Sequence, residues 1–307
     1  AGDARVAEAI GRLRAWDFST PTGVPTGYDA VDVDGAFSPP SADEVAHSVA
    51  ATIYSVWRGQ AIGNAVDKTL QGLGVPTPGS AEAVKSLRHL LERDGIGLST
   101  IDFFAWTGLP TPAQRRDYVA LKSLQDALDL LAGPAFVKAF NQSTNQDDYR
   151  WGRLHRIVFD GVAVGGPFSL PNAALGYPPS FAGLSGFAVD GGYEAVDASS
   201  HSARADSADE FMFGSGPNRR YVGVLGVSPG SIDAETILPG GMSGVLTSPF
   251  YANLLGRYLT NDTYPLRRTL GEVLQAIHGE QLFKPANPRQ GPSKNQPAGP
   301  EALQLMH

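Results

Sequence analysis

The segment Gly226–Gly230 carries the clearest pattern for catalytic chemistry in this sequence, because it reads G-V-S-P-G and follows a strand-like run. That spacing matches the G-x-S-x-G turn that presents a nucleophilic serine in many hydrolases. The oxyanion hole of such a turn uses the backbone N–H of the residue after the serine. Here that residue is Pro229, which has no N–H. We therefore interpret Ser228 as part of a strand-ending turn and not as a nucleophile.

Histidine is the side chain best suited to proton transfer near neutral pH. No two histidines of the chain are four residues apart, the spacing of a helical metal site. His47 and His89 fall on predicted helices and are interpreted as surface or packing residues. His155 and His201 lie in the strand-and-loop half, close to arginines, and are the better functional candidates. Because a histidine bonded to backbone is the commoner case, we predict that His155 and Arg156 stabilise the strands and do not transfer protons.

Arginines gather in the same half of the chain. Arg204, Arg219 and Arg220 could clamp a carboxylate through paired N–H donors. The alternative is that these arginines brace loops by pairing with Asp197 or Asp206. The sequence leaves both interpretations open and favours bracing.

Glycine pairs mark two turns that resemble phosphate-binding loops only superficially. Gly214–Gly216 reads G-S-G, and Gly240–Gly241 follows Pro239. Neither opens a helix in a βαβ unit, and the lysine of a phosphate loop is missing. Two consecutive glycines after a proline instead predict a tight turn pressed against neighbouring backbone. Asp147 and its acidic neighbour do not make a calcium loop.

The elements that would position these residues change character near residue 151. Apolar residues recur at helical spacing in the first half, and short alternating runs joined by Gly- and Pro-rich turns follow. Helices are predicted over 4–16, from a cap at Ser41, from a cap at Ser80, from Thr111-Pro112, over 251–259 and over 270–278. Strands are predicted over 154–160, 193–196 and 221–227. The class is therefore α+β, with a helical region over 1–150, a strand and loop region over 151–283 and a Pro-rich extended tail over 284–307.

Composition excludes several classes of protein and site. The chain has 307 residues, no cysteine and a net charge of -7. The missing cysteines exclude disulfides, thiol nucleophiles and thiolate zinc sites. The negative charge argues against a nucleic-acid partner, and no apolar run reaches the ~18 residues of a membrane span.

Several strings, taken in order, resemble the C-terminal part of the β chain of the penicillin acylase (penicillin amidase) family. Leu13–Asp17 reads L-R-A-W-D and is similar to the L-x-x-W-D helix end of that family. The other matching strings are Ala50–Trp57, Trp151–Arg156, Gly216-Pro217, Pro239–Gly244 and Ser248-Pro249. Tyr264–Leu266 matches the Y-x-P-L ending of the family loosely, because the intervening residue is absent here. Each string is weak alone, but their order is fairly specific and covers most of residues 1–270. The sequence departs from the family at Met242, where glutamine is more usual, and in a long insertion over 161–190.

The resemblance implies an N-terminal-nucleophile hydrolase of N-acyl amides, with an αββα fold larger than this chain, that matures by cutting its own precursor. In that family the first residue of the β chain is a serine nucleophile, and its own α-amine is the base. This chain begins with Ala1, and the oxyanion asparagine of the family precedes the L-x-x-W-D helix. We therefore expect a fragment that holds none of the core catalytic residues. A catalytically inactive binding or scaffold protein derived from the family is the alternative.

The resemblance also supplies expectations for the site and its surroundings. Candidates for the edge of the substrate pocket are His155, His201, Arg204 and Asn218; the structural turn consists of Gly240, Gly241, Ser243 and Gly244. No cofactor is expected for the chemistry, and a structural calcium implied by the family would have its ligands outside this chain. The expected partners are complementary chains from the same precursor and a small N-acyl amide, in the periplasm or outside the cell. Phenylacetyl, fatty acyl and acyl-homoserine lactone substrates all stay open.

Overall fold

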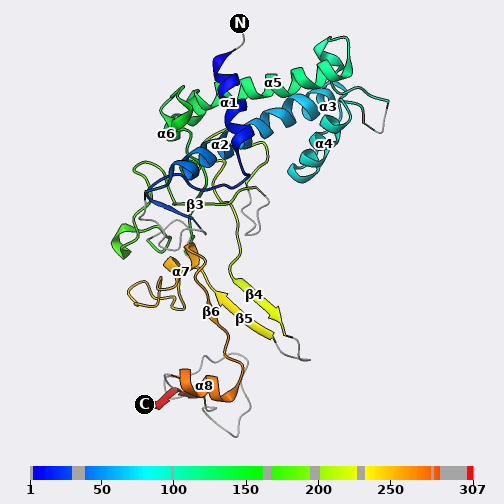
Figure 1. Ribbon diagram of the computed structural model, residues 1–307. Helices are drawn as coiled ribbons and strands as arrows, with labels where there is room; N and C mark the ends of the chain where they lie inside the picture. Colours follow the sequence, from blue (N-terminus) through cyan, green and yellow to red (C-terminus); the bar gives the residue numbers. More distant parts are fainter. Residues whose placement is uncertain are drawn as a thin grey trace. The chain divides into compact units, whose positions relative to one another are not determined.

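The computed structural model describes residues 3–29, 39–97, 100–161, 167–193, 201–226, 232–277, 280–283 and 303–306. The chain divides into a first unit, Ala1–Arg220 with Ile237–Thr263, and a second unit, Tyr221–Thr236 with Tyr264–His307. Helices dominate the N-terminal half, and small sheets appear later in the chain (Figure 1). This arrangement confirms the predicted α+β class. The proposed limits of the three sequence regions stay a prediction.

The helices of the first unit begin largely where the sequence predicts. They are α1 Ala4–Ala15, α2 Ala42–Ile62, α3 Lys68–Gly72, α4 Ser80–Glu92, α5 Pro112–Leu131, α6 Val137–Phe140 and α7 Leu255–Leu259. Ser41 and Thr111 cap α2 and α5, and each forms a reciprocal capping box with the residue three positions later. The sequence predicts Ser80 as a cap, but Gly79 occupies that position and Ser80 is the first helical residue. Its hydroxyl instead accepts the backbone N–H of Ala203 at 3.2 Å.

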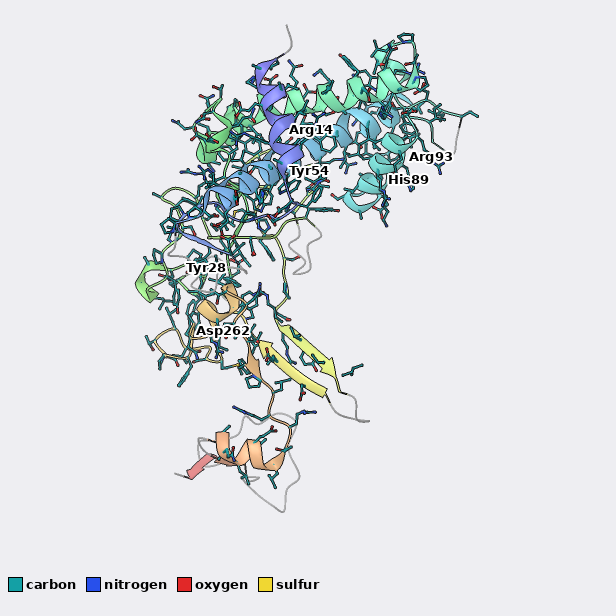
Figure 2. The ribbon with its side chains drawn as sticks, viewed as in Figure 1. Arg14, Tyr28, Tyr54, His89, Arg93 and Asp262 are labelled. Carbon is teal, nitrogen blue, oxygen red and sulfur yellow. The ribbon has the colours of Figure 1, made fainter. Side chains whose placement is uncertain are left out.

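Helix α2 is the element on which the others pack. Helices α1 and α5 lie against it in Figure 1, and Tyr54 on α2 faces the end of α1 in Figure 2. The Tyr54 ring is 5.3 Å from that of Trp16. Val49, Ile53 and Val56 of the predicted apolar stripe are fully buried. Apolar burial of this kind is the main source of folding free energy, at about 25 cal/mol per Å².

The prediction of a single apolar stripe on α2 is incomplete, because polar residues outside this stripe are buried too. Ser48 is fully buried, and its hydroxyl donates to the carbonyl of Thr22 at 2.9 Å. The same oxygen accepts the backbone N–H of Trp151 at 2.7 Å. One hydroxyl therefore joins α2 both to the loop at Thr22 and to the start of the strand and loop region at Trp151. The sequence pattern does not reveal this role, because a serine at that position also suits an exposed helix face.

On α5 the predicted apolar face is correct at three of its four leucines. Leu124, Leu128 and Leu131 are buried, whereas Leu121 is 47% exposed. The ring N–H of Trp57 donates to the carbonyl of Ala120 at 3.1 Å, so α2 contacts the backbone at this turn of α5. The buried apolar face of the helix already includes Val119, so Leu121 lies off this face at the surface.

A small sheet follows the helical region in the first unit, with the strand order β1-β3-β2. Its strands are β1 Gly27–Tyr28, β2 Arg156–Ile157 and β3 Phe187–Val189, with β1 parallel and β2 antiparallel to β3. The sequence predicts a strand over 154–160. The structure has a 3-10 turn at Trp151–Arg153, a two-residue strand, and an isolated bridge between Phe159 and Leu170. The helical turn places two hydrogen bonds onto the carbonyl of Trp151, which shortens the strand.

The second half of the first unit is mostly turns. The sequence predicts a helix over 251–259, but α7 spans Leu255–Leu259 only. Residues 239–254 form turns in which the Leu254 N–H donates to the carbonyl of Gly240 at 2.7 Å. That contact anchors the start of α7 to the glycine pair.

The second unit contains a three-stranded sheet, a short helix and a strand pair. Its elements are β4 Arg220–Leu225, β5 Ile232–Ile237, β6 Tyr264–Pro265, α8 Leu270–Ala276, β7 Glu280–Phe283 and β8 Leu303–Met306. The strand order is β4-β5-β6, and β7 pairs antiparallel with β8. The predicted strand over 221–227 corresponds to β4, and α8 ends before the predicted limit at 278. Residues 303–306 form a strand, although the sequence predicts an extended tail there.

Some predicted features lie outside the described residues. These are Ser228 and Pro229 of the G-x-S-x-G segment, the strand over 193–196 beyond Tyr193, His278, His307 and Asp197.

Candidate functional site

A cavity of about 710 Å³ opens in the first unit, where three glycine-containing segments meet. It is lined by residues 157–161, 213–218, 239–241 and 243–244, together with Phe168, Leu170, Tyr251 and Tyr258. Its volume falls within the range of ~300–1,000 Å³ that is usual for small-molecule sites. Two of the lining residues, Ile157 and Leu170, belong to a buried apolar cluster that also includes Leu255. A cavity with apolar lining residues and polar turns is the arrangement expected of a ligand site.

The glycine pair Gly240-Gly241 forms one wall of this cavity. Gly240 has φ of 75°, a conformation that residues with a Cβ rarely adopt. A Cβ on Gly241 would lie 2.6 Å from the carbonyl oxygen of Tyr251 and would also overlap that of Phe250. Ser243 returns its backbone N–H to the Phe250 carbonyl at 3.1 Å. The close approach of two backbone segments therefore requires glycine at position 241.

Aromatic rings form much of the apolar wall, and their polar atoms are already bonded. The hydroxyl of Tyr258 donates to the carbonyl of Pro217 at 2.6 Å, and that of Tyr251 donates to the carbonyl of Phe168. The Tyr258 ring meets the ring of Phe159 edge-on at 5.6 Å. These bonds hold the rings, so that their carbon faces and edges border the cavity.

Two polar side chains from different segments line the same cavity. Asp160 follows β2, and Asn218 follows the Gly216-Pro217 turn. Both residues are exposed to solvent. Asp160 has a long contact of 3.5 Å from the hydroxyl of Ser169. The sequence indicates Asn218 as a pocket-edge candidate, but it does not reveal Asp160, because a single aspartate after a strand has no distinctive pattern.

Of the four pocket-edge candidates, His155, His201 and Arg204 do not line this cavity. His155 is fully buried, stacks on Trp151 at 5.2 Å, and its Nδ1 lies 3.0 Å from the carbonyl of Val189. A carbonyl only accepts hydrogen bonds, so Nδ1 carries the proton. Burial lowers the pKa of His155 to about 4. The ring is therefore neutral at neutral pH and is held as part of the core.

His201 is the edge-on neighbour of His155, with ring centroids 6.0 Å apart. Its Nδ1 lies 3.0 Å from the carbonyl of Ser202, and burial lowers its pKa to about 4 as well. Within the described residues, the Nε2 atoms of both rings are buried and make no hydrogen bond. By contrast, His89 projects from α4 in Figure 2 and its side chain is 65% exposed.

Arg204 braces a loop, although with a different partner from those the sequence indicates. Its guanidinium donates to both carboxylate oxygens of Asp67, at 2.6 and 2.8 Å. Asp67 ends the π-helical turn Gly63–Asp67 that continues α2. The backbone on either side of Arg204 also packs on Gly59, where an added Cβ would lie 3.4–3.5 Å from it. The predicted pairing of Arg204 with Asp206 is therefore wrong, and the backbone N–H of Asp206 instead donates to Glu210. The alternative partner, Asp197, lies outside the described residues.

The sequence also does not predict a contact between Ser19 and His47. The hydroxyl of Ser19 is 3.2 Å from Nδ1 of His47 and 2.6 Å from the carboxylate of Asp17. In a hydrolytic triad the two ring nitrogens of the histidine face the serine and the carboxylate separately. Here the same nitrogen faces both, and the hydroxyl donates to the nearer carboxylate. This cluster is therefore a surface turn and not a nucleophile–base pair.

The described residues offer neither a metal-binding cluster nor a membrane-spanning helix. Among them, no three histidine, aspartate or glutamate side chains gather to hold a metal ion. These residues therefore do not fit a calcium site, and the expectation of calcium ligands elsewhere stays a prediction. No helix in the described ranges is long and apolar enough to cross a membrane.

The protein-family model described as "Penicillin amidase" matches residues 2–275. No curated protein matches the chain.

Proposed function

The chain belongs to the penicillin amidase family, and we propose that it forms part of an enzyme that hydrolyses N-acyl amides. The observation that carries the proposal is the match over residues 2–275, which includes every segment that lines the cavity. The reaction consumes one water and one amide, and it releases a carboxylic acid and an amine. In this proposal the chain contributes the border of the substrate pocket.

The nucleophile is proposed to be the N-terminal serine of a complementary segment from the same precursor. Its α-amine, which titrates near pH 8, would take the hydroxyl proton as the oxygen attacks the amide carbon. The amine leaves with a proton, and water then hydrolyses the acyl ester. Oxyanion donors are assigned to the same segment, so that this chain completes an αββα N-terminal-nucleophile fold. Autoproteolytic maturation and a periplasmic or extracellular location belong to the same proposal.

Within the described residues, the geometry is consistent with this division of labour. His155 and His201 are neutral and buried in aromatic packing, and Arg204 is committed to Asp67. We assign these three residues to positioning the loops. Asn218 and the turn at Gly240 are assigned to the pocket border, because they line the cavity directly.

Expression of the complete precursor tests the proposal. The purified protein should release the chromophore from a chromogenic N-acyl aniline, and a partner polypeptide should begin with serine. Replacing that serine by alanine should abolish turnover while binding persists. A purified protein that binds N-acyl amides but hydrolyses none would overturn the enzymatic assignment and favour the inactive binding protein.

A further inference from the structure

The charges that line the cavity are of one sign only. Asp160 is the sole charged side chain among the lining residues of the described chain, and no lysine, arginine or histidine is among them. The chain as a whole carries a net charge of -7. A carboxylate in such a setting attracts cations and repels anions.

The aromatic rings of the cavity also favour a cationic ligand. Phe159, Phe213, Tyr251 and Tyr258 all border the cavity. The face of an aromatic ring carries negative potential and attracts organic cations within about 6 Å. This protein already uses that attraction next to the cavity, where the guanidinium of Arg220 lies 4.0 Å from the centre of the Tyr258 ring.

We propose that this cavity binds an organic amine in its ammonium form, with an aromatic or bulky apolar body. The ammonium pairs with the carboxylate of Asp160, the body packs on the rings, and the amide of Asn218 is placed to hydrogen-bond a polar group of the ligand. A free carboxylic acid is disfavoured, because its charge would repel that of Asp160, and the nearby guanidinium of Arg220 is already held by the carbonyl and the ring of Tyr258.

This inference rests on the proposed function for its biological meaning, because it assigns to the cavity the amine that hydrolysis releases. The amide nitrogen of the intact substrate carries no charge, so the ammonium ion is the product and not the bound half of the substrate. Binding of the amine can nevertheless be measured without any turnover, so the two proposals can fail separately.

The test is calorimetric titration of the complete protein with benzylammonium, benzyl alcohol and phenylacetate. Benzylammonium should bind about threefold more tightly than the neutral alcohol, as expected for an ion pair with a solvent-exposed carboxylate. Asp160→Asn should remove this preference and leave the affinity for benzyl alcohol unchanged. Asp206→Asn, which removes an exposed carboxylate that does not line the cavity, should preserve it.

Location is tested with a photoreactive azidobenzylamine, followed by peptide mapping. Labels should fall on peptides that contain 157–161, 213–218 or 239–258, and excess benzylammonium should suppress them. Asp160→Glu keeps the charge and should keep the preference, which provides a second variant if Asp160→Asn fails to fold. Labelling elsewhere, or equal affinity for amine and alcohol, would overturn the inference.

The outcomes also separate this inference from the proposed function. If benzylammonium binds in a way that depends on Asp160 but the protein hydrolyses no amide, the amine site is supported and the proposed enzymatic activity is rejected. If the protein hydrolyses amides but Asp160→Asn leaves amine binding unchanged, the enzymatic activity is supported and the amine site is rejected.

Discussion

The first unit contains two regions that are stabilised in different ways. Around α2, side chains from successive helical turns pack into a continuous core, as Val49, Ile53 and Leu128 illustrate. Around the cavity, the shape depends on backbone segments that approach each other closely, as at Gly241 and the Tyr251 carbonyl. The local spacing of apolar residues therefore specifies the helical region. The cavity region is specified by contacts between separate segments of the chain, which no local spacing reveals.

This difference determines where a substitution should act. In a packed helical core, removing methyl groups costs free energy in proportion to the space that is left empty. In a region of crossing backbones, adding a single methyl group can prevent the approach altogether. The two regions should therefore respond differently to small changes in side-chain volume.

Gly241→Val should be the most damaging single substitution in the cavity region. Its Cβ would overlap the carbonyl oxygens of Phe250 and Tyr251, and neither is the movable end of a side chain. We expect little or no folded protein, measured as soluble yield and as loss of a cooperative melting transition. Gly244→Val is the matched control, since a Cβ there meets nothing within 4 Å. Equal yields and melting temperatures for the two variants would show that the turn is ordinary.

Leu128→Ala should destabilise the helical region by about 2–5 kcal/mol, because a fully buried leucine leaves a cavity. Leu121→Ala on the same helix should cost less than about 1 kcal/mol, since Leu121 is exposed. Denaturant unfolding of both variants measures the difference. Equal costs for the two variants would mean that Leu121 packs in the core as the sequence predicts.

The sequence predicts the helical region well because its signals are local. Capping residues such as Ser41 and Thr111 act on N–H groups only three positions away, so their pattern is visible in the sequence. The glycine pair at 240 is also recognisable, because few other residues tolerate a positive φ. Such signals specify elements and turns, and they are sufficient for the α+β class.

The sequence does not reveal how the elements meet. Ser48 joins three segments through one hydroxyl, and Arg204 pairs with an aspartate 137 positions away. Nothing in the local pattern distinguishes such residues from ordinary surface polar residues. Asp160 becomes a candidate only when the fold places it beside aromatic rings from other segments. Long-range pairing of polar side chains is therefore the part of the site that requires the structure.

Acidification should destabilise the junction between the two regions through its buried histidines. Burial lowers the pKa of His155 and His201 from 6.5 to about 4. As the pH falls from about 6.5 to 4, the unfolded chain binds these protons and the folded protein does not. Stability should therefore be lost across that window, by about 3 kcal/mol per histidine, and level off below it.

Denaturant unfolding at a series of pH values measures this loss. His201→Asn should reduce the slope between pH 6.5 and 4 by the share of one histidine. His89→Asn, at a side chain that is 65% exposed, is the surface control. An unchanged slope in His201→Asn would show that the ring is protonated as easily in the folded protein as in the unfolded chain.

The pair between Arg204 and Asp67 should give the smallest effect, and it tests how the loops are tied to α2. Arg204→Lys keeps the charge but cannot donate to both carboxylate oxygens from a planar fork, so we expect a loss of about 1–2 kcal/mol. A double-mutant cycle with Asp67→Asn should show a coupling of about 1 kcal/mol, since the two side chains touch. Turnover per folded molecule should stay near that of the parent, because the guanidinium is bonded to Asp67 and does not line the cavity. A large fall in turnover with unchanged stability would instead indicate that Arg204 binds the substrate. The loop would then be held on α2 by its packing against Gly59.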